Sequence, residues 1–150
     1  MTQWISFNDA IEFAITEEEA AAEFYAGMAK QMQEPALRQV FDEFAQEELR
    51  HKAKLLVIKD TGQLESDKAA VQDLKVADYI ADVKPSESMS YEDALVYAMK
   101  REKAAFRLYQ DLAERARDEK VKSAFAALAQ EEAKHKLYFE VEYDNAQTEN

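Results

Sequence analysis

The two histidines of this chain are its most informative residues, because each follows a glutamate by three positions in nearly the same octapeptide. The octapeptide AQEELRHK occupies residues 45–52, and AQEEAKHK occupies residues 129–136. A carboxylate and an imidazole at this spacing share one face of a helix. Glu48 with His51, and Glu132 with His135, could therefore each offer a metal ion one oxygen and one nitrogen ligand.

The similarity between the two halves extends well beyond these octapeptides. Residues 6–52 align without gaps with residues 90–136, and 16 of the 47 positions are identical. We call this the internal alignment. Alanine-rich helices raise such counts, but alanine does not explain matched tyrosine, phenylalanine, glutamate and histidine. The pattern indicates a duplicated helical hairpin. Matched pairs outside the octapeptides include Ser6 with Ser90, Asp9 with Asp93, Glu18 with Glu102, Tyr25 with Tyr109, and Phe41 with Phe125.

Four segments carry apolar residues at alternating spacings of four and three, which is typical of helices packed in a bundle. We call each such line of inward-facing positions a seam. The first seam runs through Phe7, Ile11, Ala14, Glu18, Ala21, Tyr25 and Met28. The second runs through Leu37, Phe41, Phe44, Glu48, His51, Leu55 and Ile58. The third runs through Tyr91, Leu95, Ala98, Glu102, Ala105, Tyr109 and Leu112, and the fourth through Val121, Phe125, Leu128, Glu132, His135 and Phe139. Every seam is interrupted by one glutamate, and two of the four also contain a histidine. The interrupting glutamates are Glu18, Glu48, Glu102 and Glu132.

The positions of these glutamates predict that they are level within each hairpin. Residue 33 is the midpoint between Glu18 and Glu48, and residue 117 is the midpoint between Glu102 and Glu132. Pro35 places a turn near residue 33, because proline suits the first turn of a helix. Each glutamate then lies about 15 residues, or roughly 22 Å, from its turn. Two equivalent hairpins packed with pseudo-twofold symmetry would bring all four carboxylates together.

Four carboxylates in one core would repel one another strongly unless cations balance their charge. Two divalent cations would balance four carboxylates. We therefore predict a site for two metals, and its six ligands are Glu18, Glu48, His51, Glu102, Glu132 and His135. The lysines and arginines beside these residues are expected to pair on the surface and to contribute little.

Tyr25 and Tyr109 each lie seven residues after a seam glutamate, two turns along the same face. One interpretation is a core aromatic residue. The other is a phenol that holds a metal-bound carboxylate in position by a hydrogen bond. The sequence leaves both open.

The predicted fold is all-α, an antiparallel four-helix bundle in a single domain over residues 1–150. The first hairpin covers about 6–58, a crossover covers about 59–89, and the second hairpin covers about 90–142. With only two glycines and two prolines, the composition favours long helices over a turn-rich β fold. Ser6 and Ser90 are predicted to cap the first and third helices.

The crossover is predicted to contain a short helix over 67–83. Its apolar positions would be Val71, Leu74 and Ile80. About 30 residues are enough to traverse the length of a helix of roughly 40 Å.

Composition excludes several classes of function. The formal net charge of −12 argues against nucleic-acid binding and suits attraction of metal cations. The absence of cysteine excludes disulfides, thiolate zinc sites and iron–sulfur clusters. The amino-terminal residues lack the basic charge of a signal peptide, and no apolar run is long enough to span a membrane. A cytoplasmic protein is expected.

The motif over residues 6–140 resembles that of the ferritin-like di-iron carboxylate proteins, and within them rubrerythrin-like proteins and bacterioferritins. Those proteins place a glutamate on each of two helices and Glu-x-x-His on the other two. The resemblance implies that Glu48 and Glu132 bridge two iron ions. It implies that the remaining four ligands are terminal, and that Tyr25 and Tyr109 are the tyrosines that orient carboxylates.

Three departures from these relatives limit the resemblance. Without cysteines there is no rubredoxin-like domain, so any electron donor must be another protein or a reductant. Ala105 stands where rubrerythrins usually have a further glutamate, which argues against their redox-linked ligand switch. Leu49 stands where bacterioferritins have a haem-ligating methionine, so no haem is expected. The short C-terminal tail also argues against a fifth helix and a storage cage.

The predicted function is a di-iron oxidoreductase of the peroxidase or ferroxidase type, in which oxidation of a di-Fe(II) centre reduces hydrogen peroxide or dioxygen. Two Fe ions are expected, although the oxygen and nitrogen ligands also suit Mn(II), and zinc could bind adventitiously. One alternative is a metal-binding or iron-sequestering bundle without useful turnover. Another is a bare helical scaffold, in which replacing Glu48 with leucine would stabilise the metal-free fold.

The duplicated hairpins and the long crossover also permit exchange of helices between two chains. A homodimer is therefore expected. An external electron-donor protein is a further expected partner, and no nucleic acid or membrane is expected to bind.

Overall fold

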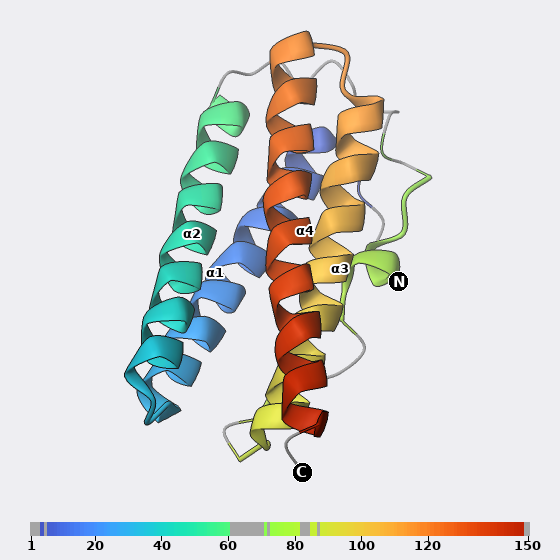
Figure 1. Ribbon diagram of the computed structural model, residues 1–150. Helices are drawn as coiled ribbons and strands as arrows, with labels where there is room; N and C mark the ends of the chain where they lie inside the picture. The colour runs from blue at the N-terminus through green and yellow to red at the C-terminus, as the bar shows by residue number, and fades with distance from the viewer. Residues whose placement is uncertain are drawn as a thin grey trace. The chain divides into compact units, whose positions relative to one another are not determined.

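Four long helices make up most of the chain in a computed structural model that describes residues 4, 6–60, 71, 73–81, 85–86 and 88–148 (Figure 1). The chain divides into two compact units, Trp4–Gln72 and Asp73–Asn150, which we call the N-terminal and C-terminal units. Each unit contains one helical hairpin. The prediction of an all-α fold built from two hairpins is confirmed.

The N-terminal unit pairs α1 (Phe7–Gln31) with α2 (Pro35–Asp60). Ser6 caps α1, since its hydroxyl accepts a hydrogen bond from the Asp9 backbone N–H at 3.3 Å. Pro35 is the first residue of α2, as predicted from its fixed φ and missing N–H. The two helices run side by side in opposite directions (Figure 1).

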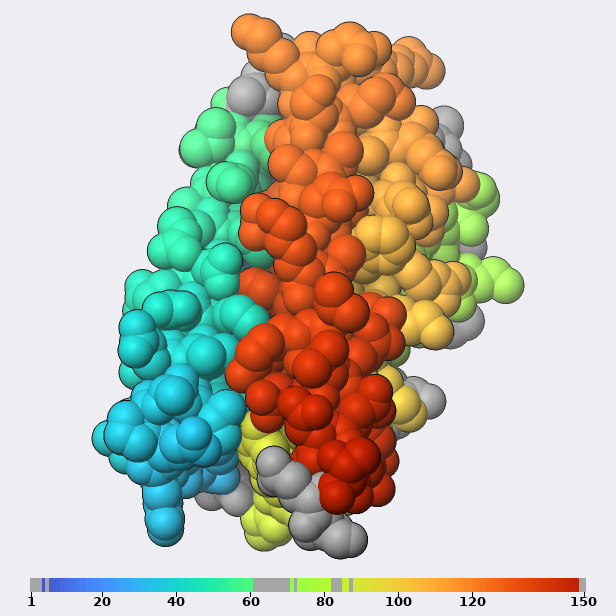
Figure 2. All heavy atoms as spheres, viewed as in Figure 1, coloured from blue at the N-terminus to red at the C-terminus, as the bar shows by residue number. Residues whose placement is uncertain are grey.

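The C-terminal unit repeats this design with α3 (Tyr91–Arg115) and α4 (Glu119–Thr148). Ser90 caps α3 by accepting a hydrogen bond from the Asp93 backbone N–H at 3.1 Å. Helix α4 extends to Thr148, which is beyond the predicted hairpin boundary near residue 142. Its outward side chains form a continuous column on the face of the molecule drawn in Figure 2.

The two turns correspond to each other in the internal alignment. In each hairpin a basic side chain near the start of the second helix binds a carbonyl near the end of the first helix. Arg38 donates to the Met32 carbonyl oxygen at 2.9 Å, and Lys122 donates to the Ala113 carbonyl oxygen at 2.9 Å. These bonds satisfy carbonyl groups that a helix end leaves without an intrahelical partner. The turns lie around residues 33 and 117, as the glutamate midpoints predicted.

The predicted seams form the buried faces of the helices. Every member of the first and fourth seams is buried. In the second seam Leu37 and Phe44 are only half-buried, as is Tyr91 at the start of the third. Heptad spacing therefore located the buried face of each helix, which in α4 ends at Phe139.

The prediction for the crossover is only partly correct. Residues 67–70, 72 and 82–83 of the predicted helix lie outside the described residues, and part of the remainder forms a 3₁₀ helix, η2 (Val76–Tyr79). Val71 and Leu74 are buried as expected, but Ile80 is exposed and Tyr79 is buried instead. A 3₁₀ helix has fewer residues per turn than an α-helix, so the α-helical spacing predicted Ile80 as the buried residue in place of Tyr79.

The 3₁₀ helix η2 packs against α3, and Tyr79 links the two elements. Its hydroxyl donates a hydrogen bond to Asp111 Oδ2 at 2.6 Å. Burial raises the pKa of Tyr79 above the usual tyrosine value, and the hydrogen bond to the Asp111 carboxylate raises it further. Among the described helices, none has a stretch long and apolar enough to cross a bilayer.

Gly27 offers a direct test of helix propensity in α1. It lies in the helix interior, and a Cβ atom added there would meet nothing within 4 Å. We expect Gly27→Ala to raise the free energy of unfolding by about 1 kcal/mol, because glycine loses more backbone entropy than alanine. Urea denaturation followed by circular dichroism measures this change. The reverse substitution at the neighbouring position, Ala26→Gly, should lower stability by a similar amount, and a destabilising Gly27→Ala would contradict the prediction.

Tyr79→Phe should destabilise the protein by about 1–3 kcal/mol at neutral pH, since it leaves the hydrogen bond to a charged carboxylate unmade. The folded-state pKa of Tyr79 is raised, so its contribution is fully present below the unfolded tyrosine pKa of roughly 10 and is lost as pH rises above that value. The stability difference between the two proteins should therefore narrow above that pH. Tyr143→Phe, near the end of α4, is the control. This role of Tyr79 would be contradicted if the loss in free energy of unfolding did not depend on pH, or if it equalled the loss in Tyr143→Phe.

Candidate metal-binding half-sites

Each unit contains a buried cluster of two glutamates and one histidine, which we call its half-site. The seam glutamates of both half-sites are completely buried, and each histidine is only 3% exposed.

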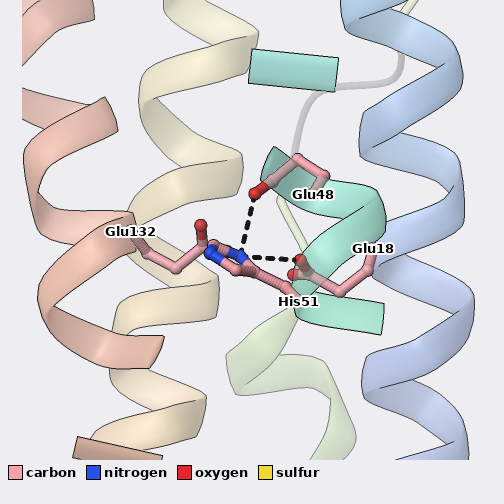
Figure 3. A group of neighbouring side chains, drawn as sticks. All are labelled: Glu18, Glu48, His51 and Glu132. Atoms are coloured by element: carbon pink, nitrogen blue, oxygen red, sulfur yellow. Dashed lines mark hydrogen bonds and ion pairs between the residues drawn. The ribbon is translucent and has the colours of Figure 1, made fainter. Parts of the chain in front are cut away.

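The N-terminal half-site consists of Glu18 on α1 and of Glu48 and His51 on α2. His51 Nδ1 lies 3.1 Å from Glu18 Oε2 and 3.1 Å from Glu48 Oε1. One oxygen from each carboxylate and one ring nitrogen of His51 lie within 4.8 Å of one another. Figure 3 shows both carboxylates directed toward the imidazole. The glutamates face each other across the hairpin, as their equal distances from the turn predicted.

The C-terminal half-site repeats this cluster with Glu102 on α3 and with Glu132 and His135 on α4. His135 Nδ1 lies 3.3 Å from Glu102 Oε1 and 3.6 Å from Glu132 Oε1. One oxygen from each carboxylate and one ring nitrogen again lie within 4.8 Å of one another. All six predicted ligands are thus found in two clusters of the predicted composition.

The C-terminal half-site contains a third charged side chain, Arg101, which was predicted to pair on the surface and is instead buried. Arg101 is 4% exposed and its Nη1 lies 2.8 Å from Glu132 Oε2 and 3.0 Å from Glu102 Oε2. The expectation that neighbouring basic residues pair on the surface is correct for Lys52, which lies 3.6 Å from the exposed Glu19. It is wrong for Arg101.

A sequence signal for Arg101 was present. The internal alignment pairs Arg101 with Glu17, so the two halves differ in charge beside an identical seam glutamate. Arg101 is also three residues after Ala98 and four before Ala105, both of which are buried. That spacing places Arg101 at the edge of the inward face. The small alanine side chains one turn to either side favour a buried arginine there.

The two predicted tyrosines are buried beside aromatic side chains of the partner helix. Tyr25 lies with its ring centroid 6.1 Å from that of Phe44 and 6.4 Å from that of Phe41. Tyr109 stacks on Phe125 with ring centroids 6.3 Å apart. These contacts fit a core aromatic residue, and the role of the phenols in orienting carboxylates stays a prediction.

The donor set of each half-site fits a metal ion. Two buried carboxylates carry negative charge that an apolar environment would otherwise disfavour, and an imidazole nitrogen points at both. Oxygen and nitrogen donors without sulfur suit Fe(II), Mn(II) or Zn(II). In the C-terminal half-site Arg101 already interacts with one oxygen of each carboxylate, and the other two oxygens lie toward His135.

Comparisons with known proteins agree with this geometry. A family model described as Rubrerythrin matches residues 9–143. A crystal structure from Thermotoga maritima, of a protein proposed to be a ferritin-like diiron-carboxylate protein, superposes with a TM-score of 0.77 at 16% sequence identity. That match covers 97% of this chain and 99% of the other. It shows that this chain has the ferritin-like fold, a four-helix bundle. No curated protein matches the sequence.

Proposed function

We propose a function from the premise that this chain belongs to the rubrerythrin family. The proposed function is that of a di-iron carboxylate oxidoreductase, which reduces hydrogen peroxide or dioxygen. The observation that supports it is the repeated half-site, in which one oxygen from each of two buried carboxylates lies 3.1–3.6 Å from an imidazole nitrogen. We propose that the two half-sites together hold two iron ions.

The chain's own residues would bind the metals, balance their charge and exclude water. Glutamate oxygens of Glu18, Glu48, Glu102 and Glu132 and one ring nitrogen from each histidine would be the ligands. In both half-sites Nδ1 is the nitrogen that lies toward the carboxylates, so Nδ1 is the donor that the fold presents. An Fe(II) pair bound there would supply the two electrons that reduce hydrogen peroxide to water.

The complete burial of the carboxylates would serve this chemistry in two ways. Charge interactions are stronger in a water-excluded interior than in solvent, so bound cations would be held firmly. The helix faces also hold the ligands rigidly, because each seam glutamate lies mid-helix between buried apolar residues. Tyr25 and Tyr109, on the same faces, are proposed to orient the ligand carboxylates.

We further propose that the protein is a cytoplasmic homodimer that receives electrons from a separate donor. Helix α2 exposes three large apolar side chains, Leu49, Leu56 and Val57, and Val57 is 66% exposed. Burying such a surface against a second copy of the chain would be favourable.

An anaerobic titration with Fe(II) tests the proposed activity. We expect saturation at two iron ions per chain, followed by rapid oxidation on addition of hydrogen peroxide and repeated turnover when a reductant is supplied. Glu48→Gln should lower the stoichiometry, because it removes a charged ligand, and Glu47→Gln is a matched control outside the seam. Failure to bind iron would refute the proposal. Slow oxidation of bound iron without re-reduction would instead indicate an iron-sequestering bundle.

Light scattering tests the proposed dimer. We expect a mass twice that of the 17.2 kDa chain. Val57→Glu should shift the protein toward a monomer, because it places a charge in the apolar surface of α2. Leu137→Glu, at an exposed position on α4, is the control. A monomeric wild-type protein would contradict the proposal.

A further inference from the structure

We propose that Arg101 is a built-in cation of the C-terminal half-site and makes the two metal positions unequal. The N-terminal half-site binds a metal ion first, and the C-terminal half-site binds its ion more weakly because a fixed positive charge is already paired with its carboxylates. This inference rests on the proposed function and adds an order of loading to it.

Arg101 contacts the same two carboxylates that would bind a metal ion in the C-terminal half-site. Its Nη1 donates to Glu132 Oε2 at 2.8 Å and to Glu102 Oε2 at 3.0 Å, and its side chain is buried. The Oε1 atoms of the same two glutamates lie toward His135. One oxygen of each carboxylate is therefore engaged by a guanidinium group. A metal ion entering this half-site would either bind only the remaining oxygen of each glutamate or displace the arginine side chain.

The formal charges of the two half-sites differ for the same reason. With neutral imidazoles, the N-terminal half-site carries two negative charges from Glu18 and Glu48. The C-terminal half-site carries two negative charges and the positive charge of Arg101, which leaves one. Arginine cannot lose its proton under physiological conditions. A divalent cation is therefore attracted less strongly to the C-terminal half-site and is repelled by the guanidinium.

The same contacts explain how the metal-free C-terminal half-site tolerates two carboxylates within one core. Charge-assisted hydrogen bonds from arginine are among the stronger polar interactions in a protein interior. In the N-terminal half-site the aligned position is Glu17, an acidic residue. The duplicated hairpins have thus kept identical ligands but differ in the charge placed beside the first ligand of each hairpin.

Calorimetric titration with Mn(II), which needs no turnover, tests this inequality. We expect two classes of site in the wild-type protein, with dissociation constants that differ by about tenfold or more, given the strength of a buried like-charge interaction. Arg101→Gln should tighten the weaker class and reduce the difference. Arg107→Gln removes the same charge from an exposed position on α3 and should leave both classes unchanged. Glu18→Gln should remove the tighter class, and Glu102→Gln the weaker.

Several outcomes would overturn the inference while leaving the proposed function intact. These are two wild-type sites of equal affinity, an Arg101→Gln isotherm equal to that of Arg107→Gln, or loss of the weaker class in Glu18→Gln. If Arg101→Gln does not fold, Arg101→Lys retains the charge and should retain two unequal classes, so equal classes in that variant would also overturn it. Absence of any Mn(II) or Fe(II) binding by the wild-type protein would refute the proposed function itself.

Discussion

The cost of burying negative charge is the constraint on which the rest of this structure depends. One glutamate interrupts each of the four largely apolar seams, and all four glutamates are completely buried. Isolated carboxylates would be strongly disfavoured in such an environment. Each of them therefore lies beside a compensating group: His51 in the N-terminal half-site, and His135 with Arg101 in the C-terminal half-site. Within each hairpin, the helices, caps and turn hold the two glutamates and the histidine level with one another.

The short turn of each hairpin determines that its two glutamates lie opposite each other. Because each turn is centred at the midpoint between a pair of glutamates, the glutamates of each hairpin face each other without any long-range adjustment. The serine caps of α1 and α3 occupy matched positions in the internal alignment, and each turn has its own basic residue bound to a carbonyl. The duplication therefore preserved the devices that fix helix ends as well as the ligands. A displacement of one residue in either turn would rotate a glutamate by about 100° away from its partner.

Much of this architecture could be predicted from the sequence because it depends on local periodicity. Heptad spacing identified the buried face of each helix and the glutamates Glu18 and Glu102 on it, and the duplicated Glu-x-x-His motif identified the other four residues of the half-sites. The crossover was predicted less well, since the 3₁₀ helix around Tyr79 does not follow the spacing of an α-helix. Arg101 was misplaced for a different reason. A long basic side chain beside a seam can reach solvent or a buried carboxylate, and periodicity alone does not choose between them.

Arg101 also changes how the charges of the site add up. Four carboxylates and two divalent cations would balance if the half-sites contained no other charge, and the sequence alone predicts two metals on that basis. With a buried guanidinium in one half-site, the carboxylates of that half are already partly neutralised before any metal arrives. Identical ligands in the two halves therefore do not imply identical affinities. A duplicated sequence can keep the residues that bind and vary a neighbouring charge, and the neighbouring charge then decides which half binds more tightly.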